Sequence, residues 1–243
     1  TYTAYVRSDC GVDGLSGWVS CGTFTTLCAP TSVPYTKYMD PGSDGFTIPA
    51  IPACMTKQNT GGNQWVTVNS APYSDMFDEH LIYNFNATQA ANAWVYTQGI
   101  NMIAGQTYRL SYLYGGSSQF TFITNKMKVM YGTAPEVASM STLLDDHPII
   151  KTSAFKNVVN FTAPSTGVFY FGFQAYSDAN NGELFLDDIE IFTSTCISPT
   201  AIVIPPALVT FNSALVTWTA PVPAPAGGYA YYLSTSATPP VNG

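Results

Sequence analysis

LFLDDIEIF, at residues 184–192, places apolar side chains in alternation around a central pair of acids. A period of two is typical of a β-strand with one buried face. The same period recurs in TYRLSYLY (107–114), MKVMY (127–131), FKNVVNF (155–161) and VFYFGFQ (168–174). Gly- and Pro-rich turns separate these stretches. The sequence therefore predicts an all-β fold, a sandwich or jelly roll of short strands.

The remaining stretches fit around this centre. Residues 136–144 (EVASMSTLL) predict a short helix or helical turn between two strands. Residues 1–7 and 17–25 predict a hairpin with a Gly- and Asp-rich loop. Near the other end, three or four strands with Pro-rich joints are predicted at 199–204, 207–211, 214–219 and 228–234. Neither end holds the roughly seven strands of a complete sandwich.

The composition narrows the class of protein. Hydrophobic residues make up 46% of the 243 residues and charged residues only 9%, with a net charge of −7. An acidic chain lacks the basic surface that nucleic acids need, so we expect no nucleic-acid partner. No apolar run approaches the roughly 20 residues of a membrane span, so we expect no membrane insertion. Five cysteines outside C-x-x-C pairs indicate disulfides and an oxidising, extracellular location.

Asp187 and Asp188 interrupt an otherwise apolar strand. Alternation directs them to opposite faces, so at least one carboxylate should lie on a face that favours apolar side chains. A buried carboxylate needs a partner, and the chain has only eight Lys and Arg. Calcium, which prefers oxygen ligands, is the cation that we expect there as a structural cofactor. In the alternative interpretation, Asp188 caps a loop backbone and Asp187 is solvated.

The cysteines allow more than one pairing. Cys10 and Cys21 flank the N-terminal hairpin loop and could bridge its strands, while Cys28 and Cys54 bracket the first strand of the central region. Cys196 is then left over. In a second arrangement, Cys196 and Cys10 have partners outside the chain and Cys21 is the odd one.

Other polar and aromatic groups carry weaker signals. Asp145–His147 predicts a solvated loop and Asp78–His80 a strand entry, because neither contains a second histidine for acid–base or metal chemistry. Trp65 and Tyr73 fall in Gly- and Ser-rich stretches, where exposed aromatic rings could stack on sugars. The chain contains no G-x-S-x-G, H-E-x-x-H or phosphate-loop motif, so we expect it not to be an enzyme.

Residues 33–193 resemble the cleaved-adhesin, or choice-of-anchor J, family. The resemblance rests on PYT (34–36), IPAC (51–54), WVYT (94–97), AGQTYRLSY (104–112), TAPSTGVFYFGF (162–173) and LFLDDI (184–189). It implies a MAM-like jelly roll. Residues 196–243 are similar to the start of a fibronectin type III module, and residues 1–28 to the end of one. The chain would then cover about one period of a tandem array.

The resemblance also carries functional expectations. It implies structural calcium held by a last-strand acid, Asp187 or Asp188, and by Asp40 near the first strand. Asp44, Asp75, Asp78 and Asp178 are further candidates. It implies a non-catalytic structural or adhesive segment of a large bacterial surface protein, exported by the type IX route of Bacteroidetes and used in attachment or gliding. Its partners would be neighbouring modules and surface glycans or proteins. A carbohydrate-binding accessory domain of a secreted hydrolase is the alternative.

Overall fold

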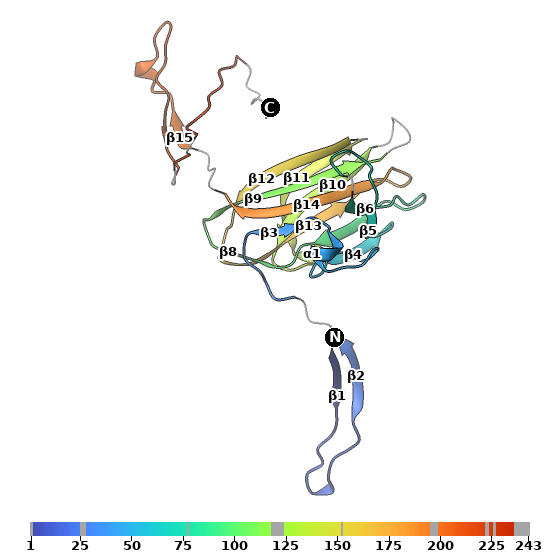
Figure 1. Ribbon diagram of the computed structural model, residues 1–243. Helices are drawn as coiled ribbons and strands as arrows, with labels where there is room; N and C mark the ends of the chain where they lie inside the picture. Colours follow the sequence, from blue (N-terminus) through green and yellow to red (C-terminus); the bar gives the residue numbers. More distant parts are fainter. Residues whose placement is uncertain are drawn as a thin grey trace.

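The computed structural model describes residues 2–24, 28–76, 78–117, 124–151, 153–194, 199–221, 224–225 and 227–235. Their strands and short helices, shown in Figure 1, are β1 (Tyr2–Val6), β2 (Val19–Phe24), β3 (Tyr35–Lys37), α1 (Pro41–Asp44), β4 (Thr56–Gly61), β5 (Trp65–Asn69), β6 (Glu79–Tyr83), β7 (Asn92–Tyr96), β8 (Ile100–Met102), β9 (Thr107–Gly116), β10 (Asn125–Gly132), β11 (Met140–Ile150), β12 (Ser153–Thr162), β13 (Gly167–Ala175), β14 (Leu184–Thr193), β15 (Thr200–Val203) and β16 (Thr217–Thr219). Single 3-10 turns lie at Gly11–Asp13, Val137–Ser139 and Pro206–Leu208.

Two antiparallel sheets of six strands form a sandwich in the middle of the chain (Figure 1). The first sheet has the order β11-β10-β13-β7-β4, with β8 also paired to β13. The second has the order β12-β9-β14-β6-β5, with β3 also paired to β14. The predicted all-β sandwich is therefore confirmed, and the predicted alternating stretches lie in β9, β10, β12, β13 and β14. The narrower assignment to a jelly roll stays a prediction.

Alternation explains why these strands pack as they do. Inward-facing side chains of both sheets interleave in one core, including Leu110, Tyr112, Phe171, Phe173 and Ile189, which are fully buried. Burying each such side chain contributes about 1.5–3 kcal/mol. The core therefore lies between the two sheets, and smaller apolar clusters cover part of each outer face, around Trp94 on the first sheet and Phe185 on the second.

The predicted helix at 136–144 is wrong. Only Val137–Ser139 forms a 3-10 turn, and Met140–Ile150 continues as β11 against β10. Val137, Met140 and Leu144 recur at helical spacing, but pairing with β10 satisfies the backbone of Met140–Ile150 and overrides this short pattern. The Asp145–His147 stretch therefore lies in a strand and not in the predicted loop.

The two ends of the chain form small separate sheets. β1 and β2 pair as the predicted hairpin, while β15 pairs only with β16. The predicted strands at 207–211 and 228–234 are not formed as strands in the described residues. Each small sheet leaves large apolar side chains exposed, unlike the sandwich. No helix of the described residues is both long and apolar enough to cross a membrane.

Candidate functional site

The acids of β14 lie where its neighbours change. One edge of β14 pairs with β9 at Leu184–Asp187 and again at Glu190–Thr193, and the register shifts between these two stretches. The other edge pairs with β6 at Leu184–Leu186 and with β3 at Ile189–Ile191. Asp187 and Asp188 occupy the junction between these two partners, and Asp188 has a left-handed backbone with φ of 48°. The acidic pair therefore marks a bulge on which two strand ends converge.

Asp187 is the buried member of the pair, with 3% of its surface exposed. One of its carboxylate oxygens accepts a hydrogen bond from the Asp188 backbone N–H at 2.8 Å. Burial raises the pKa of Asp187 to about 8. This value includes the hydrogen bond from the Asp188 N–H, which lowers the pKa, and the charges of Asp188, Asp78 and Asp44, which raise it. Without a bound cation the Asp187 carboxyl is therefore mainly protonated at neutral pH.

A lysine already supplies one cation beside this junction. Lys37 ends β3, and its Nζ lies 3.0 Å from Oδ1 of Asp44, with the two side chains 12% and 6% exposed. The second oxygen of Asp44, Oδ2, is buried and has no hydrogen-bond partner among the described residues. The pair is thus a buried ion pair with one unsatisfied oxygen, which costs free energy unless another group reaches it.

The predicted calcium ligands do not come together as a set. Asp40 is exposed and caps α1, because its carboxylate accepts hydrogen bonds from Gly42 N at 2.8 Å and from the Ser43 hydroxyl. No group of three His, Cys, Asp or Glu residues within the described ranges is placed to hold a metal ion. The donors as they stand do not fit a calcium site that includes Asp40, and calcium binding stays a prediction.

The other predicted acids are dispersed. Asp178 pairs with Lys126 at 2.7 Å on the surface, and Asp75 accepts a hydrogen bond from Ser74. Asp78 precedes β6 and acts on Asp187 only through its charge. Of these three acids, Asp78 is therefore the one that adds to the negative potential at Asp187.

A polar network joins the edge strands β11 and β12, which belong to different sheets. Asn157 donates hydrogen bonds to the Tyr112 hydroxyl at 2.7 Å and to Asp145 Oδ2 at 2.6 Å. The Tyr112 hydroxyl also lies 2.7 Å from His147 Nε2. Burial lowers the pKa of His147, and the charges of Asp145 and Asp146 oppose this shift. The His147 ring stacks on the Tyr114 ring, with the two ring centroids 4.1 Å apart. The network closes this side of the sandwich.

A straight row of side chains crosses the outer face of the first sheet. The strand registers align Asp146 with Lys128, Lys128 with Gln174, Gln174 with Trp94, and Trp94 with Gln58. We call these five residues the transverse row. Trp94 is buried within it, whereas the other four are partly or fully exposed. The row therefore places a carboxylate, an ammonium and two amides on the same outer face, where Gln58 Oε1 accepts hydrogen bonds from the Tyr96 hydroxyl and the Val137 N–H.

Neighbouring residues hold this row in place. Asn92 Oδ1 accepts hydrogen bonds from Trp94 Nε1 at 3.1 Å and from Gln174 Nε2 at 2.9 Å. The Tyr176 hydroxyl donates to Asp146, and Lys128 Nζ lies 4.7 Å from the centre of the Tyr176 ring. A preorganised polar surface loses little entropy on binding. Sequence alternation alone could direct Lys128 and Gln174 outward, but the alignment depends on registers between five strands.

Trp65 and Tyr73 do not form the predicted sugar platform. Trp65 is fully buried in β5, where its Nε1 donates to the Ala93 carbonyl at 3.1 Å. Tyr73 donates its hydroxyl proton to the Gly116 carbonyl and packs against Phe185. The flanking Gly and Ser residues suggested loops, but the apolar alternation of WVTV continues the second sheet. The predicted exposure of Trp65 is therefore wrong.

One predicted disulfide is formed and one is not. Cys28 and Cys54 are bonded, which ties the segment before β3 to the segment before β4. Cys10 and Cys21 are free and exposed. Cys21 lies beside the Ala4–Tyr5 part of β1, whereas Cys10 lies several residues further along the hairpin. At about 3.3 Å per residue this offset exceeds the reach of a disulfide. Cys196 lies outside the described residues.

Comparison with known proteins gives solved structures only. No protein-family model matches the chain, and no curated protein matches it. The K1 cleaved adhesin domain of Lys-gingipain from Porphyromonas gingivalis W83 is 14% identical, with a TM-score of 0.48 over 59% of this chain and 93% of that domain. The K2 domain of Lys-gingipain is 13% identical, with a TM-score of 0.48 over 67% and 99%. TmCBM61, solved with β-1,4-galactotriose, is 13% identical, with a TM-score of 0.46 over 66% and 99%. At these identities the likeness concerns the β-sandwich fold alone.

Proposed function

We propose that this chain is a non-catalytic adhesive module of an extracellular surface protein, and that the transverse row makes the adhesive contact. The observation that carries the proposal is the alignment of five side chains across five strands on one outer face. The Cys28–Cys54 disulfide supports an oxidising, extracellular location.

The chemistry of the row suits recognition and not bond cleavage. Tyr176 contacts both charged residues of the row, Lys128 through its ring and Asp146 through its hydroxyl. The amides of Gln174 and Asn92 offer both donors and acceptors at fixed positions. Such groups recognise neutral polar surfaces through many weak contacts, which is what adhesion requires.

Bead adhesion tests the proposal. Beads coated with the chain should be retained on polysaccharide- or protein-coated glass under flow. A Lys128→Glu, Gln174→Ala variant should lose most of this retention, because the row loses a donor and gains a repulsive charge. Arg109→Glu, at an exposed position on β9 of the second sheet, makes the same change in charge; it is the matched control and should retain wild-type adhesion. Equal retention of the two variants would refute the assignment of the row.

Carbohydrate binding by an accessory module is the second candidate. The observation that favours it is the grouping of Tyr176, Asn92 and Gln174, since aromatic rings beside amides suit sugar stacking and hydrogen bonding. Calorimetric titration with neutral oligosaccharides should show binding that Tyr176→Ala removes. A glycan array without hits at millimolar sensitivity would contradict this candidate and leave protein surfaces as the adhesive target.

A further inference from the structure

We propose that copies of this chain associate head to tail, with the β1–β2 hairpin of one copy covering an apolar groove in the C-terminal segment of the next. This inference does not rest on the proposed adhesive face. It rests on two surfaces with exposed apolar side chains, one on the β1–β2 hairpin and one in the C-terminal segment.

The hairpin is the first of these sheets. Its register places Val6 opposite Val19 on one face of the hairpin. The side chain of Val6 is 57% exposed and that of Val19 is 65% exposed. A two-stranded hairpin is marginally stable at best by itself in water. Covering this face would stabilise the hairpin, and both outer strand edges could accept further pairing.

The C-terminal segment provides the matching surface. A groove of about 530 Å³ is lined by Ile202, Val216, Trp218, Tyr229 and Tyr231, among other residues. Trp218 and Tyr229 meet edge to face, with ring centroids 5.2 Å apart. Tyr231 is 89% exposed and Ile202 64%. Asn160 of β12 also lines the groove, which therefore lies between the C-terminal segment and one edge strand of the sandwich. An apolar, aromatic-lined groove is the kind of surface that a small apolar sheet covers.

Charge distribution favours this occupant. Not one of the 53 residues after Glu190 is Asp, Glu, Lys, Arg or His, and residues 1–6 are also uncharged. Natural sheet edges normally carry charges that prevent pairing with other chains. Neither the groove nor strand β1 has this protection, so no like-charge repulsion opposes their contact. The nearest hairpin charge, Arg7, is engaged over the Trp18 ring at 4.4 Å.

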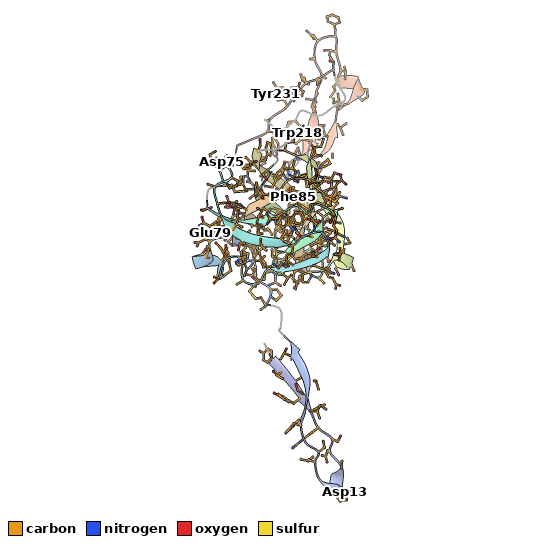
Figure 2. All side chains as sticks on the ribbon, turned by 90° about the vertical axis from the view of Figure 1, so that its right-hand side faces the viewer. Asp13, Asp75, Glu79, Phe85, Trp218 and Tyr231 are labelled. Carbon is orange, nitrogen blue, oxygen red and sulfur yellow. A yellow bond between two sulfur atoms is a disulfide. The ribbon has the colours of Figure 1, made fainter. Side chains whose placement is uncertain are left out.

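The placement of the two sheets selects a second copy as the partner. In Figures 1 and 2 the hairpin, with Asp13 at its tip, and the segment carrying Trp218 and Tyr231 lie on opposite sides of the sandwich. One type of contact between copies covers both apolar surfaces at once. Because the two contacting surfaces differ, the contact is heterologous, and such contacts extend into chains when they do not close into a ring.

Complementing variants test the pairing direction. In a Val6→Lys, Val19→Glu variant the opposed charges keep the cross-strand pair but make the hairpin face polar. A Trp218→Lys variant places a charge in the groove. Tyr231→Lys does the same at a side chain that is 89% exposed, so this second variant should fold normally. Light scattering should show that wild-type mass grows with concentration above 26.1 kDa. Each variant alone should associate about 30-fold more weakly or not at all.

The mixture gives the decisive result. Hairpin-blocked and groove-blocked chains mixed in equal amounts should form a species of two chains and nothing larger, because one intact hairpin meets one intact groove. If the groove-blocked chain alone associated as strongly as the wild type, hairpins would pair with hairpins. If the hairpin-blocked chain alone did so, grooves would pair with grooves. Either result overturns the proposal, as does a wild type that stays monomeric. Phe155→Lys, at an exposed apolar site on the sandwich, is the control and should associate like the wild type.

Discussion

Replacing Asp187 with Asn should remove a large pH dependence of stability. Asp187 is 3% exposed, and burial raises its pKa from 3.8 to about 8. The folded state therefore holds a proton that the unfolded state has already released between about pH 4 and pH 8. Stability is fully present below the unfolded pKa and falls as pH rises through the folded pKa. At about 1.4 kcal/mol per pH unit, the loss reaches roughly 5 kcal/mol by pH 8.

Asn has nearly the shape of Asp and stays neutral throughout this range. Its Oδ1 can still accept the hydrogen bond from the Asp188 N–H, which Asp187 accepts at 2.8 Å. The Asp187→Asn variant should therefore lose stability less steeply with pH and should exceed the wild type at pH 8. We expect its unfolding free energy at pH 8 to exceed that of the wild type by several kcal/mol. An Asn amide nitrogen without an acceptor would reduce this difference.

Urea denaturation of both proteins at pH 5, 6, 7 and 8, in the presence of a chelator, measures the effect. Asp188→Asn is the matched control, because Asp188 is only half-buried and Lys156 partly offsets its raised pKa. Its slope should change less than that of Asp187→Asn. Parallel pH profiles for the wild type and Asp187→Asn would refute the reasoning, since they would show that Asp187 titrates normally in the folded protein.

Four further predictions follow from other contacts. Calcium, the cation predicted from the sequence, should raise the wild-type melting temperature but not that of Asp187→Asn; no shift with either protein would contradict calcium binding. Replacing Cys28 and Cys54 with Ser should lower the unfolding free energy by about 3.5 kcal/mol in urea titration, since the bond closes a loop with a sequence separation of 26. Gly182→Ala should cost at least about 3 kcal/mol, because a Cβ there would lie 1.6 Å from the Ser117 carbonyl oxygen; an unchanged melting temperature would contradict this. Tyr112→Phe should cost about 1–3 kcal/mol by calorimetry, since it leaves buried polar partners unpaired.

The strands were predictable from the sequence because alternation is a local signal. LFLDDIEIF predicts both the strand and a buried acid within it, and Asp187 is buried in β14 as expected. The position of Trp65 was not predictable in this way. Its Gly- and Asn-rich neighbours resemble a loop, and only pairing of β5 with β6 places the ring in the core. Local composition was overridden there by a contact between strands.

The site itself depends on contacts that no local pattern reveals. Asp40 was expected to face the acids of β14, but a Pro-Gly-Ser sequence after it forms a short helix that needs a cap. Lys37 instead turns inward to Asp44, seven residues later in the sequence. The transverse row likewise requires the registers of five strands that are far apart in the chain. Pairing order, and not residue type, decides which of these side chains meet.

The strand pairing also separates the two main sets of experiments. β14 is paired along both edges in the middle of a six-stranded sheet, so a change at Asp187 acts on the whole sandwich. β1 and β16 each pair with a single neighbour and contribute nothing to the main buried core. Variants in the hairpin or groove should therefore alter association at an unchanged sandwich melting temperature. Asp187→Asn should do the reverse, and a variant that altered both would show that the flanking sheets are coupled to the sandwich.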